Sequence, residues 1–164
     1  MRYIGIDPGL DGGVAILETD ENPQGFVMPV KPTGKGREVN VNTIVCEGWL
    51  HSVTGVVIER QQCYPKQGGK SNYTIGYNYG KLIALLEAEA VPFEVVAPKE
   101  WQREFGISGA KGDTKKQAAL VAARLFPCVE LRATERCRVP HSGIVDSLLI
   151  AEYGRRKQGG TTNG

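Results

Sequence analysis

The N-terminal part of the chain alternates short β-prone runs with turn residues. Residues 2–7 and 13–18 are mostly apolar and are joined by Pro8-Gly9 and a pair of glycines, a pattern that predicts a β-hairpin. A shorter run over residues 26–28 predicts a third antiparallel strand. Asp7 ends the first strand directly before the turn. Its carboxylate either caps the backbone of that turn or serves a functional site at the tip of the strand.

The next segment predicts a loop, a helix and a buried strand. Residues 29–37 hold two prolines, two glycines and three bases, which predicts a mobile basic loop, either solvated or in contact with a ligand. Apolar residues at three- and four-residue steps predict a helix over residues 40–53. The β-branched run 56–58 is typical of a central strand covered on both faces. It ends in Glu59, so a second apolar strand carries an acid at its tip.

Residues 60–86 combine bases with tyrosines and contain no acid. Residues 61–71 predict a flexible loop, and a helix is expected from about residue 72 to residue 90. Gly76 and Gly80 leave a flat strip on this helix, where another element can approach closely. A basic, aromatic loop directly after an acid favours phosphate contact and base stacking, and a solvated loop with core tyrosines is the alternative. The candidate nucleic-acid contacts of this segment are Arg60, Tyr64, Lys66 and Lys70.

The C-terminal half predicts one further strand and three helices. Residues 92–96 are β-prone, a short helix starts at Pro98, and a longer one follows with Thr114 as its N-cap. Lysines at the start of that helix lie where free backbone amides favour phosphate, although solvated lysines are the alternative. These candidates are Lys111, Lys115 and Lys116. The last helix is followed by residues 158–164, which lack apolar side chains and predict a disordered tail after a single domain over 1–157.

Composition and charge narrow the classes of function. A chain of 164 residues with 41% hydrophobic content is long enough for one domain with a real core. The net charge of +2 does not by itself indicate a nucleic-acid partner. No apolar run is long enough for a membrane span, and no signal-peptide pattern begins the chain. The four scattered cysteines favour a reduced, cytoplasmic protein, and Cys137 with His141 is only a weak zinc signal.

Three acids occur at the ends of apolar elements, namely Asp7, Glu59 and Asp146. The predicted order of elements places Asp7 on a central strand, Glu59 on its neighbour and Asp146 on a helix packed across them. Carboxylates near a core cost free energy unless they are paired or bind cations, so this convergence favours hard divalent metals. Mg²⁺ prefers oxygen ligands. Two such ions, roughly 4 Å apart, can activate a water and stabilise the leaving 3′ oxygen of a phosphodiester.

The segments around these acids resemble the RuvC-type Holliday junction resolvases. The resemblance rests on Ile-Gly-Ile-Asp-Pro-Gly at residues 4–9, Val-Ile-Glu at 57–59 and Val-Asp-Ser-Leu-Leu-Ile-Ala at 145–151. Residues 92–101 and 149–156 most resemble the phage and prophage relatives. The resemblance covers about residues 1–157. It implies an RNase H-like fold, with a central mixed five-stranded sheet (three antiparallel strands, then parallel) flanked by helices.

The same resemblance implies a homodimer that uses two Mg²⁺ or Mn²⁺ ions per active site to cut four-way DNA junctions by paired, symmetric nicks. Asp7, Glu59 and Asp146 match the family's metal-binding catalytic acids. Tyr64 lies near the position of an aromatic residue at the crossover. Lys111, Lys115 and Lys116 fall where the family uses lysines on DNA phosphates.

The chain departs from the family pattern at one position. The family has an Asp or His three or four residues before the last acid, where this chain has Gly143 and Ser142. Either His141 serves as a fourth metal ligand or general base, or Ser142 replaces an aspartate and activity is reduced or lost. We take His141 as the fourth member of the site.

The sequence thus predicts a metal-dependent, structure-specific endonuclease for four-way DNA junctions, in the cytoplasm of a bacterial or phage-infected cell. A nuclease for other branched DNA or for RNA–DNA hybrids is one alternative, because fold does not settle substrate. A catalytically weakened junction-binding protein is the other.

Overall fold

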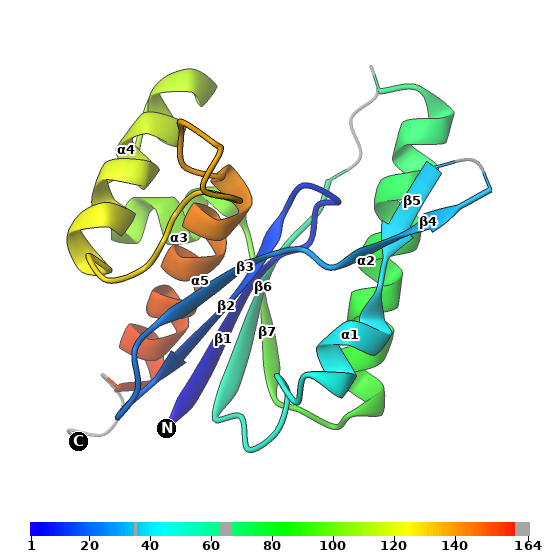
Figure 1. The fold of residues 1–164 in the computed structure, drawn as a ribbon, viewed down its shortest axis with the longest axis horizontal. Helices are drawn as coiled ribbons and strands as arrows, with labels where there is room; N and C mark the ends of the chain where they lie inside the picture. The colour runs from blue at the N-terminus through cyan, green and yellow to red at the C-terminus, as the bar shows by residue number, and fades with distance from the viewer. Residues whose placement is uncertain (35, 63–66, 160–164) are drawn as a thin grey trace.

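The fold is a five-stranded mixed sheet with helices on both faces (Figure 1). The structure is a computed structural model that describes residues 1–34, 36–62 and 67–159. The sheet has the order β3-β2-β1-β6-β7, in which β1 pairs antiparallel with β2, β2 pairs antiparallel with β3, and β6 and β7 continue in parallel. Its strands are β1 (Arg2–Asp7), β2 (Gly13–Glu18), β3 (Gln24–Val27), β6 (Gly55–Glu59) and β7 (Phe93–Val96). The predicted fold class is confirmed.

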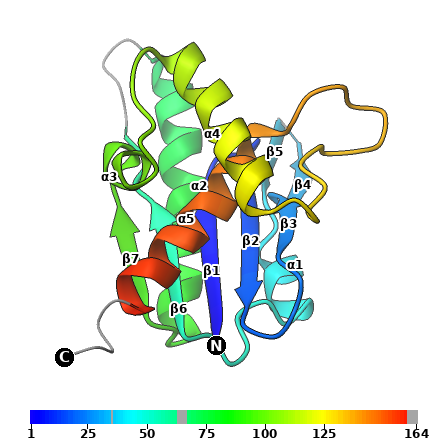
Figure 2. The same cartoon turned by 90° about the vertical axis from the view of Figure 1, so that its left-hand side faces the viewer.

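The two faces of the sheet are covered by different helices (Figures 1 and 2). One face packs on α3 (Pro98–Glu104), α4 (Lys111–Leu125) and α5 (Ser142–Gly159), around buried residues such as Leu148 and Trp101. The other face packs on α1 (Val41–Cys46) and α2 (Gly69–Ala88), around Ile4, Ile58 and Leu82. Strands β1 and β6 are therefore buried on both sides, as their continuous apolar runs require.

The prediction of a mobile basic loop at residues 29–37 is wrong. The chain instead forms a second, two-stranded sheet of β4 (Val30–Thr33) and β5 (Gly36–Val39). Lys31 and Glu38 are directly opposite in this register and form an ion pair of 3.2 Å. The hairpin is anchored on α2, where the Asn78 side chain accepts from the Val39 N–H at 2.7 Å and Lys81 donates to the Val39 carbonyl at 2.6 Å.

Several predicted helix boundaries also change. The helix expected over residues 40–53 ends at Cys46, because the chain turns at Gly48 with φ of +66°, yet Trp49 and Leu50 remain buried. Helix α2 begins at Gly69, within the predicted loop, and α4 has Ala110 rather than Thr114 at its N-cap. Helix α5 runs to Gly159, past the predicted domain end at residue 157, and residues 160–164 lie outside the described residues. No helix of the described segments is long and apolar enough to cross a membrane.

Candidate active site

Three elements bring the predicted acids to one edge of the sheet. Strands β1 and β6 are parallel, with Ile6 opposite Ile58, so the next residues, Asp7 and Glu59, end side by side. Helix α5 lies directly on β1, because Gly5 has no side chain: a Cβ there would fall 2.1 Å from the Ser147 carbonyl oxygen. This close approach places Asp146, the residue before Ser147, over the ends of both strands. The predicted placement of the three acids is confirmed.

A backbone contact between glycines fixes the position of the turn that follows Asp7. A Cβ on Gly143, in the first turn of α5, would lie 2.2 Å from the carbonyl carbon of Gly12. A Cβ on Gly13 would lie 2.4 Å from the Gly143 carbonyl oxygen. The turn and the start of α5 therefore interlock without side chains between them. The Gly9 N–H also donates to the Asp7 carboxylate at 3.3 Å, so the turn-capping role weighed for Asp7 accompanies its place in the cluster.

Burial raises the pKa values of all three acids, and the charge of Asp7 raises those of Glu59 and Asp146 further. Burial, followed by the charge of Asp7, raises the pKa of Glu59 to about 7. Burial and the charges of Asp7 and Glu59 raise the pKa of Asp146 to about 8, against the opposing effect of Lys115. Burial also raises the pKa of Asp7, although the Gly9 N–H, His141 and Lys115 lower it. Like charges crowded near a core are typical of functional sites.

Trp101 is part of this cluster, and the sequence interpretation did not assign it a role. Its indole Nε1 donates to the Glu59 carboxylate at 2.7 Å, and its side chain is only 1% exposed. The hydrogen bond lowers the pKa of Glu59 against the effect of burial. Helix α3 therefore orients Glu59 through this hydrogen bond. The only sequence signal was a tryptophan in a short helix after a Pro, which does not identify its partner.

His141 lies at the start of α5. Its carbonyl accepts from the Val145 N–H at 3.1 Å, so His141 occupies the N-cap position and Ser142 is the first helical residue. The imidazole Nδ1 is buried and has no hydrogen-bond partner among the described residues. Because His141 lowers the pKa of Asp7, its ring is near the cluster. An unsatisfied buried nitrogen there is available to a ligand.

The donor set suits a hard divalent cation. Three crowded carboxylates and one unsatisfied imidazole nitrogen offer oxygen-rich coordination, which Mg²⁺ and Mn²⁺ prefer. As the side chains stand, no three His, Cys, Asp or Glu residues in the described ranges are grouped closely enough to hold an ion. A bound cation would therefore require side-chain rotations at Asp7, Glu59 or Asp146. The same finding gives no support to zinc at Cys137 and His141, and Cys137 lies 3.3 Å from the Thr134 hydroxyl.

A cavity of about 350 Å³ opens beside Asp146. Lys115 and Lys116, from the second turn of α4, line it together with Ser142 and Val139. Both lysines are exposed, and no described carboxylate forms an ion pair with either of them. A phosphate that approached the acids would therefore meet two cations at the entrance.

Of the other residues predicted to contact nucleic acid, those that the structure describes do not line the cavity beside Asp146. Arg60 directly follows Glu59 and is exposed. Burial raises the pKa of Tyr79 in α2, and the charge of Arg60 partly opposes that rise. Lys70 is exposed in the first turn of α2. Tyr64 and Lys66 lie outside the described residues, as does the side chain of Lys111, whose backbone begins α4.

Comparison with known proteins identifies the fold. No protein-family model matches this chain, and no curated protein sequence matches it either. Among solved structures, RuvC of T. thermophilus in complex with a Holliday junction substrate is 19% identical, with a TM-score of 0.62 and 98% of each chain covered. Another Thermus thermophilus RuvC structure is 20% identical, with a TM-score of 0.59 and the same coverage.

A eukaryotic structure is similar as well. The yeast mitochondrial Holliday junction resolvase Ydc2 is 18% identical, with a TM-score of 0.52 over 95% of this chain and 78% of its own. At these identities the likeness shows a shared fold. The predicted resemblance to RuvC-type resolvases is confirmed at that level.

Proposed function

We propose that this chain is a divalent-metal-dependent endonuclease that resolves four-way DNA junctions by paired, symmetric nicks. The observation that carries the proposal is the convergence of Asp7, Glu59 and Asp146, two of them with pKa values raised to about 7 and about 8. Three mutually repelling acids at the edge of a sheet contribute nothing to stability, so their arrangement is best explained by a bound cation. Mg²⁺, or Mn²⁺ in its place, is the proposed cofactor, with two ions per site.

Each member of the site has a role in this proposal. Asp7, Glu59 and Asp146 hold the metal ions, which when bound supply an activated water and charge stabilisation at the leaving 3′ oxygen. Trp101 fixes the orientation of Glu59 through its hydrogen bond. His141 is the fourth member of the site, as a ligand or general base, because its Nδ1 is buried beside Asp7 without a partner among the described residues. Lys115 and Lys116 guide the scissile phosphate into the adjoining cavity.

The junction as substrate is supported by the related structures, one of which is RuvC bound to a Holliday junction. Paired nicks require two sites, and we propose a homodimer for this reason. The exposed face of α2 suits a second copy: Tyr73 and Tyr77 stack on each other with ring centroids 6.0 Å apart and are 72% and 44% exposed. A Cβ at Gly76 or Gly80 would meet no described atom within 4 Å apart from the neighbouring backbone of α2 itself, so the strip between them is open to a partner.

A second candidate is a junction-binding protein with little or no cleavage. The observation that favours it is the fourth position, where Ser142 and Gly143 offer no acid and only His141 is available. In this case the lysines beside Asp146 would still bind phosphate.

The experiment that tests the proposal is cleavage of an end-labelled, synthetic four-way DNA junction. The reaction is run with Mg²⁺, with Mn²⁺ and with EDTA, beside an RNA–DNA hybrid and a replication fork of the same arm length. Symmetric nicks on the junction alone, lost with EDTA, support the resolvase. Cleavage of the hybrid or fork at an equal rate would assign a different substrate.

The variants His141→Ala and Ser142→Asp distinguish between the two candidate functions. If the wild type cuts and His141→Ala does not, His141 is a member of the site. If the wild type binds the junction without nicks and Ser142→Asp cuts, the chain is a catalytically weakened relative.

Sedimentation of the wild type and of Gly80→Arg tests the proposed homodimer. The side chain added to the open strip of α2 should dissociate the dimer.

A further inference from the structure

A second cavity lies on the other side of the start of α4. It has a volume of about 450 Å³ and is formed by α3, the connection after it and α4. Its lining includes Lys99, Arg103, Gly106, Ser108, Gly109 and Thr114. None of the predicted site residues lines this cavity.

The connection that forms the floor of this cavity is held in a defined shape. Gly106 and Gly109 have φ values of +67° and +113°, which glycine adopts without strain. The Gln117 side chain of α4 binds both backbone groups of Ser108, accepting from its N–H at 3.1 Å and donating to its carbonyl at 2.8 Å. Glycines also leave the backbone accessible. The cavity is therefore preformed, and a ligand would not need to order the loop.

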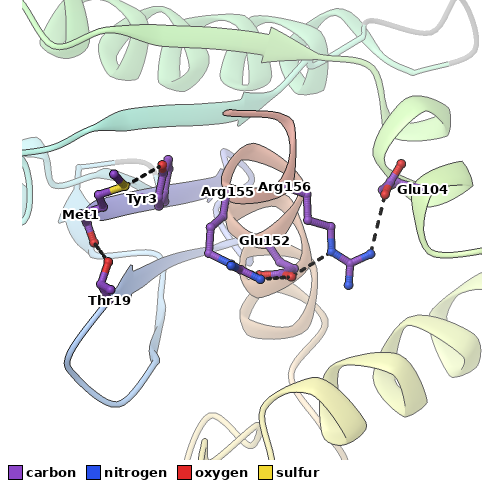
Figure 3. Close-up of polar contacts among 7 residues, drawn as sticks. All are labelled: Met1, Tyr3, Thr19, Glu104, Glu152, Arg155 and Arg156. Atoms are coloured by element: carbon purple, nitrogen blue, oxygen red, sulfur yellow. Dashed lines mark hydrogen bonds and ion pairs between the residues drawn. The ribbon is translucent and has the colours of Figure 1, made fainter. Parts of the chain in front are cut away.

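The charged residues that line the cavity are both cations. Lys99 and Arg103 are one turn apart on α3 and exposed, and neither forms an ion pair with any described residue. The carboxylates of α3 are engaged elsewhere. Glu100 accepts from the Tyr153 hydroxyl at 2.9 Å, and Glu104 lies 3.6 Å from Arg156 of α5 (Figure 3).

Three carboxylates, Glu100, Glu104 and Asp113, lie near this cavity without lining it. Arg103 also borders a neighbouring cavity that contains Glu100 and Glu104. Asp113 lies near Gly109, where its Cβ would be 3.9 Å from a Cβ on that glycine, but it does not line the cavity. The described residues that line the cavity therefore include two cations and no acid. This chemistry suits a phosphate group.

The position of the cavity connects it to the active site. Thr114 lines it, and the next residue, Lys115, lines the cavity that contains Asp146. The two cavities therefore flank the same turn of α4, at the end of the molecule where the helices α4 and α5 begin (Figure 2). A strand whose scissile phosphate lies at the acids has further phosphates along its backbone, and this cavity is adjacent.

We propose that the cavity between α3 and α4 binds a backbone phosphate of the nucleic acid, beyond the scissile phosphate, through Lys99 and Arg103. The inference rests on the proposed function in that the bound strand continues from the acids. The shared chemistry is a phosphate group, so inorganic phosphate is the second source to be distinguished.

The test measures junction affinity against salt concentration in the Asp7→Asn background, so that binding is observed without cleavage. Each phosphate contact that is lost should reduce the slope of log affinity against log salt by about 0.9. We expect this reduction for Lys99→Ala and for Arg103→Ala, and Arg103→Lys should restore most of the slope. Arg124→Ala, an exposed arginine in the last turn of α4, is the matched control and should leave the slope unchanged. Melting temperatures confirm that all variants fold.

Amide chemical shifts of Ser108 and Gly109 identify the source of the phosphate. Shifts that saturate with duplex DNA, and not with inorganic phosphate at the same phosphate concentration, support the proposal. Saturation by inorganic phosphate with no change of slope in the two variants would replace it with a free-phosphate site. Slopes equal to that of Arg124→Ala, with no shift from either ligand, would overturn it.

Failure of this inference is distinguishable from failure of the proposed function. Junction cleavage with unchanged slopes rejects the second phosphate site and leaves the nuclease intact. Reduced slopes in a protein that never cleaves reject the nuclease and leave the phosphate site.

Discussion

Helix α5 carries two carboxylates in opposite surroundings, the half-buried Asp146 near its start and the buried Glu152 nearer its end. Glu152 is 5% exposed and accepts hydrogen bonds from Arg155 at 2.6 and 2.7 Å and from Arg156 at 2.8 Å (Figure 3). Burial raises its pKa, but the two guanidinium groups outweigh that effect and hold the pKa below its usual value. Burial, followed by the charges of Asp7 and Glu59, raises the pKa of Asp146 to about 8, and Lys115 only partly opposes that rise.

The difference between the two acids separates a structural role for Glu152 from the role that we propose for Asp146. Arg156 also approaches Glu104 at 3.6 Å and lies 4.8 Å from the centre of the Phe105 ring, so the cluster around Glu152 connects α5 to α3. Within residues 1–34, 36–62 and 67–159, no ion pair connects Asp146 to another element, and its charge opposes folding when no cation is bound. The contrast between a fully paired acid and an acid among like charges therefore supports the proposed cation site at Asp146.

The largest expected effect is loss of cleavage at the acid cluster. Asp7→Asn or Glu59→Gln should reduce junction cleavage by roughly 10³-fold or more, since each removes a group that acts in the transition state. Junction affinity should remain, because the lysines at the entrance are unchanged. Single-turnover cleavage and fluorescence anisotropy measure the two properties separately. Near-normal cleavage by either variant would reject the metal-site assignment.

A smaller effect is expected when Glu59 loses its orienting partner. Trp101→Phe keeps most of the buried ring but removes the donor to Glu59, and cleavage should fall by about 10- to 100-fold. Trp49→Phe is the matched control, because Trp49 is also buried but stacks on Phe26, in the core on the other face of the sheet. Equal rates for the two variants would show that the Trp101 hydrogen bond has no catalytic importance.

Glu152 gives the opposite prediction, a loss of stability without a loss of chemistry. Glu152→Gln leaves two arginines without their acid, and the free energy of unfolding should fall by about 1–2 kcal/mol, since the arginines are partly solvated. A lowered pKa means that the stabilisation is present above the unfolded value near 4.5 and is lost as pH falls through the folded value. Urea titrations at pH 7 and pH 3 should therefore show a smaller difference between wild type and variant at pH 3. Cleavage by the folded variant should be unchanged.

Much of the fold could be predicted from local patterns. The apolar run ending in Asp7 and the β-branched run ending in Glu59 identify the two central strands, because strands buried on both faces leave a continuous apolar signal. The basic segment at 29–37 was misassigned because its pairing depends on partners outside the segment, notably Asn78 of α2 and the opposed Lys31 and Glu38. The prolines and glycines of this segment indicate a flexible loop when the segment is considered alone. Contacts with other parts of the fold hold it in a hairpin instead.

The candidate site was predictable only in part. Acids at the tips of apolar elements give a local signal, and the structure brings the three predicted acids together. Trp101 and the contact of Gly12 with Gly143 depend on distances between segments far apart in the chain, which no local pattern encodes. The cavity lined by Lys99 and Arg103 was missed for the same reason, since α3 by itself resembles a short surface helix.

The most direct test of the account is the thermal stability of Asp146→Asn and Glu152→Gln at pH 8, in EDTA and in Mg²⁺. A raised pKa means that stability is lost as pH rises from the unfolded value of 3.8 toward about 8, so Asp146→Asn relieves a cost that is nearly complete at pH 8. In EDTA we expect Asp146→Asn to be more stable than wild type by about 1–2 kcal/mol, equivalent to roughly 3–6 °C, and Glu152→Gln to be less stable.

Addition of Mg²⁺ should raise the melting temperature of the wild type and of Glu152→Gln, and should have little effect on Asp146→Asn. That pattern would show that a bound cation relieves the repulsion among the acids of the cluster. A wild type that is unaffected by Mg²⁺ and is more stable than Asp146→Asn in EDTA would contradict the account.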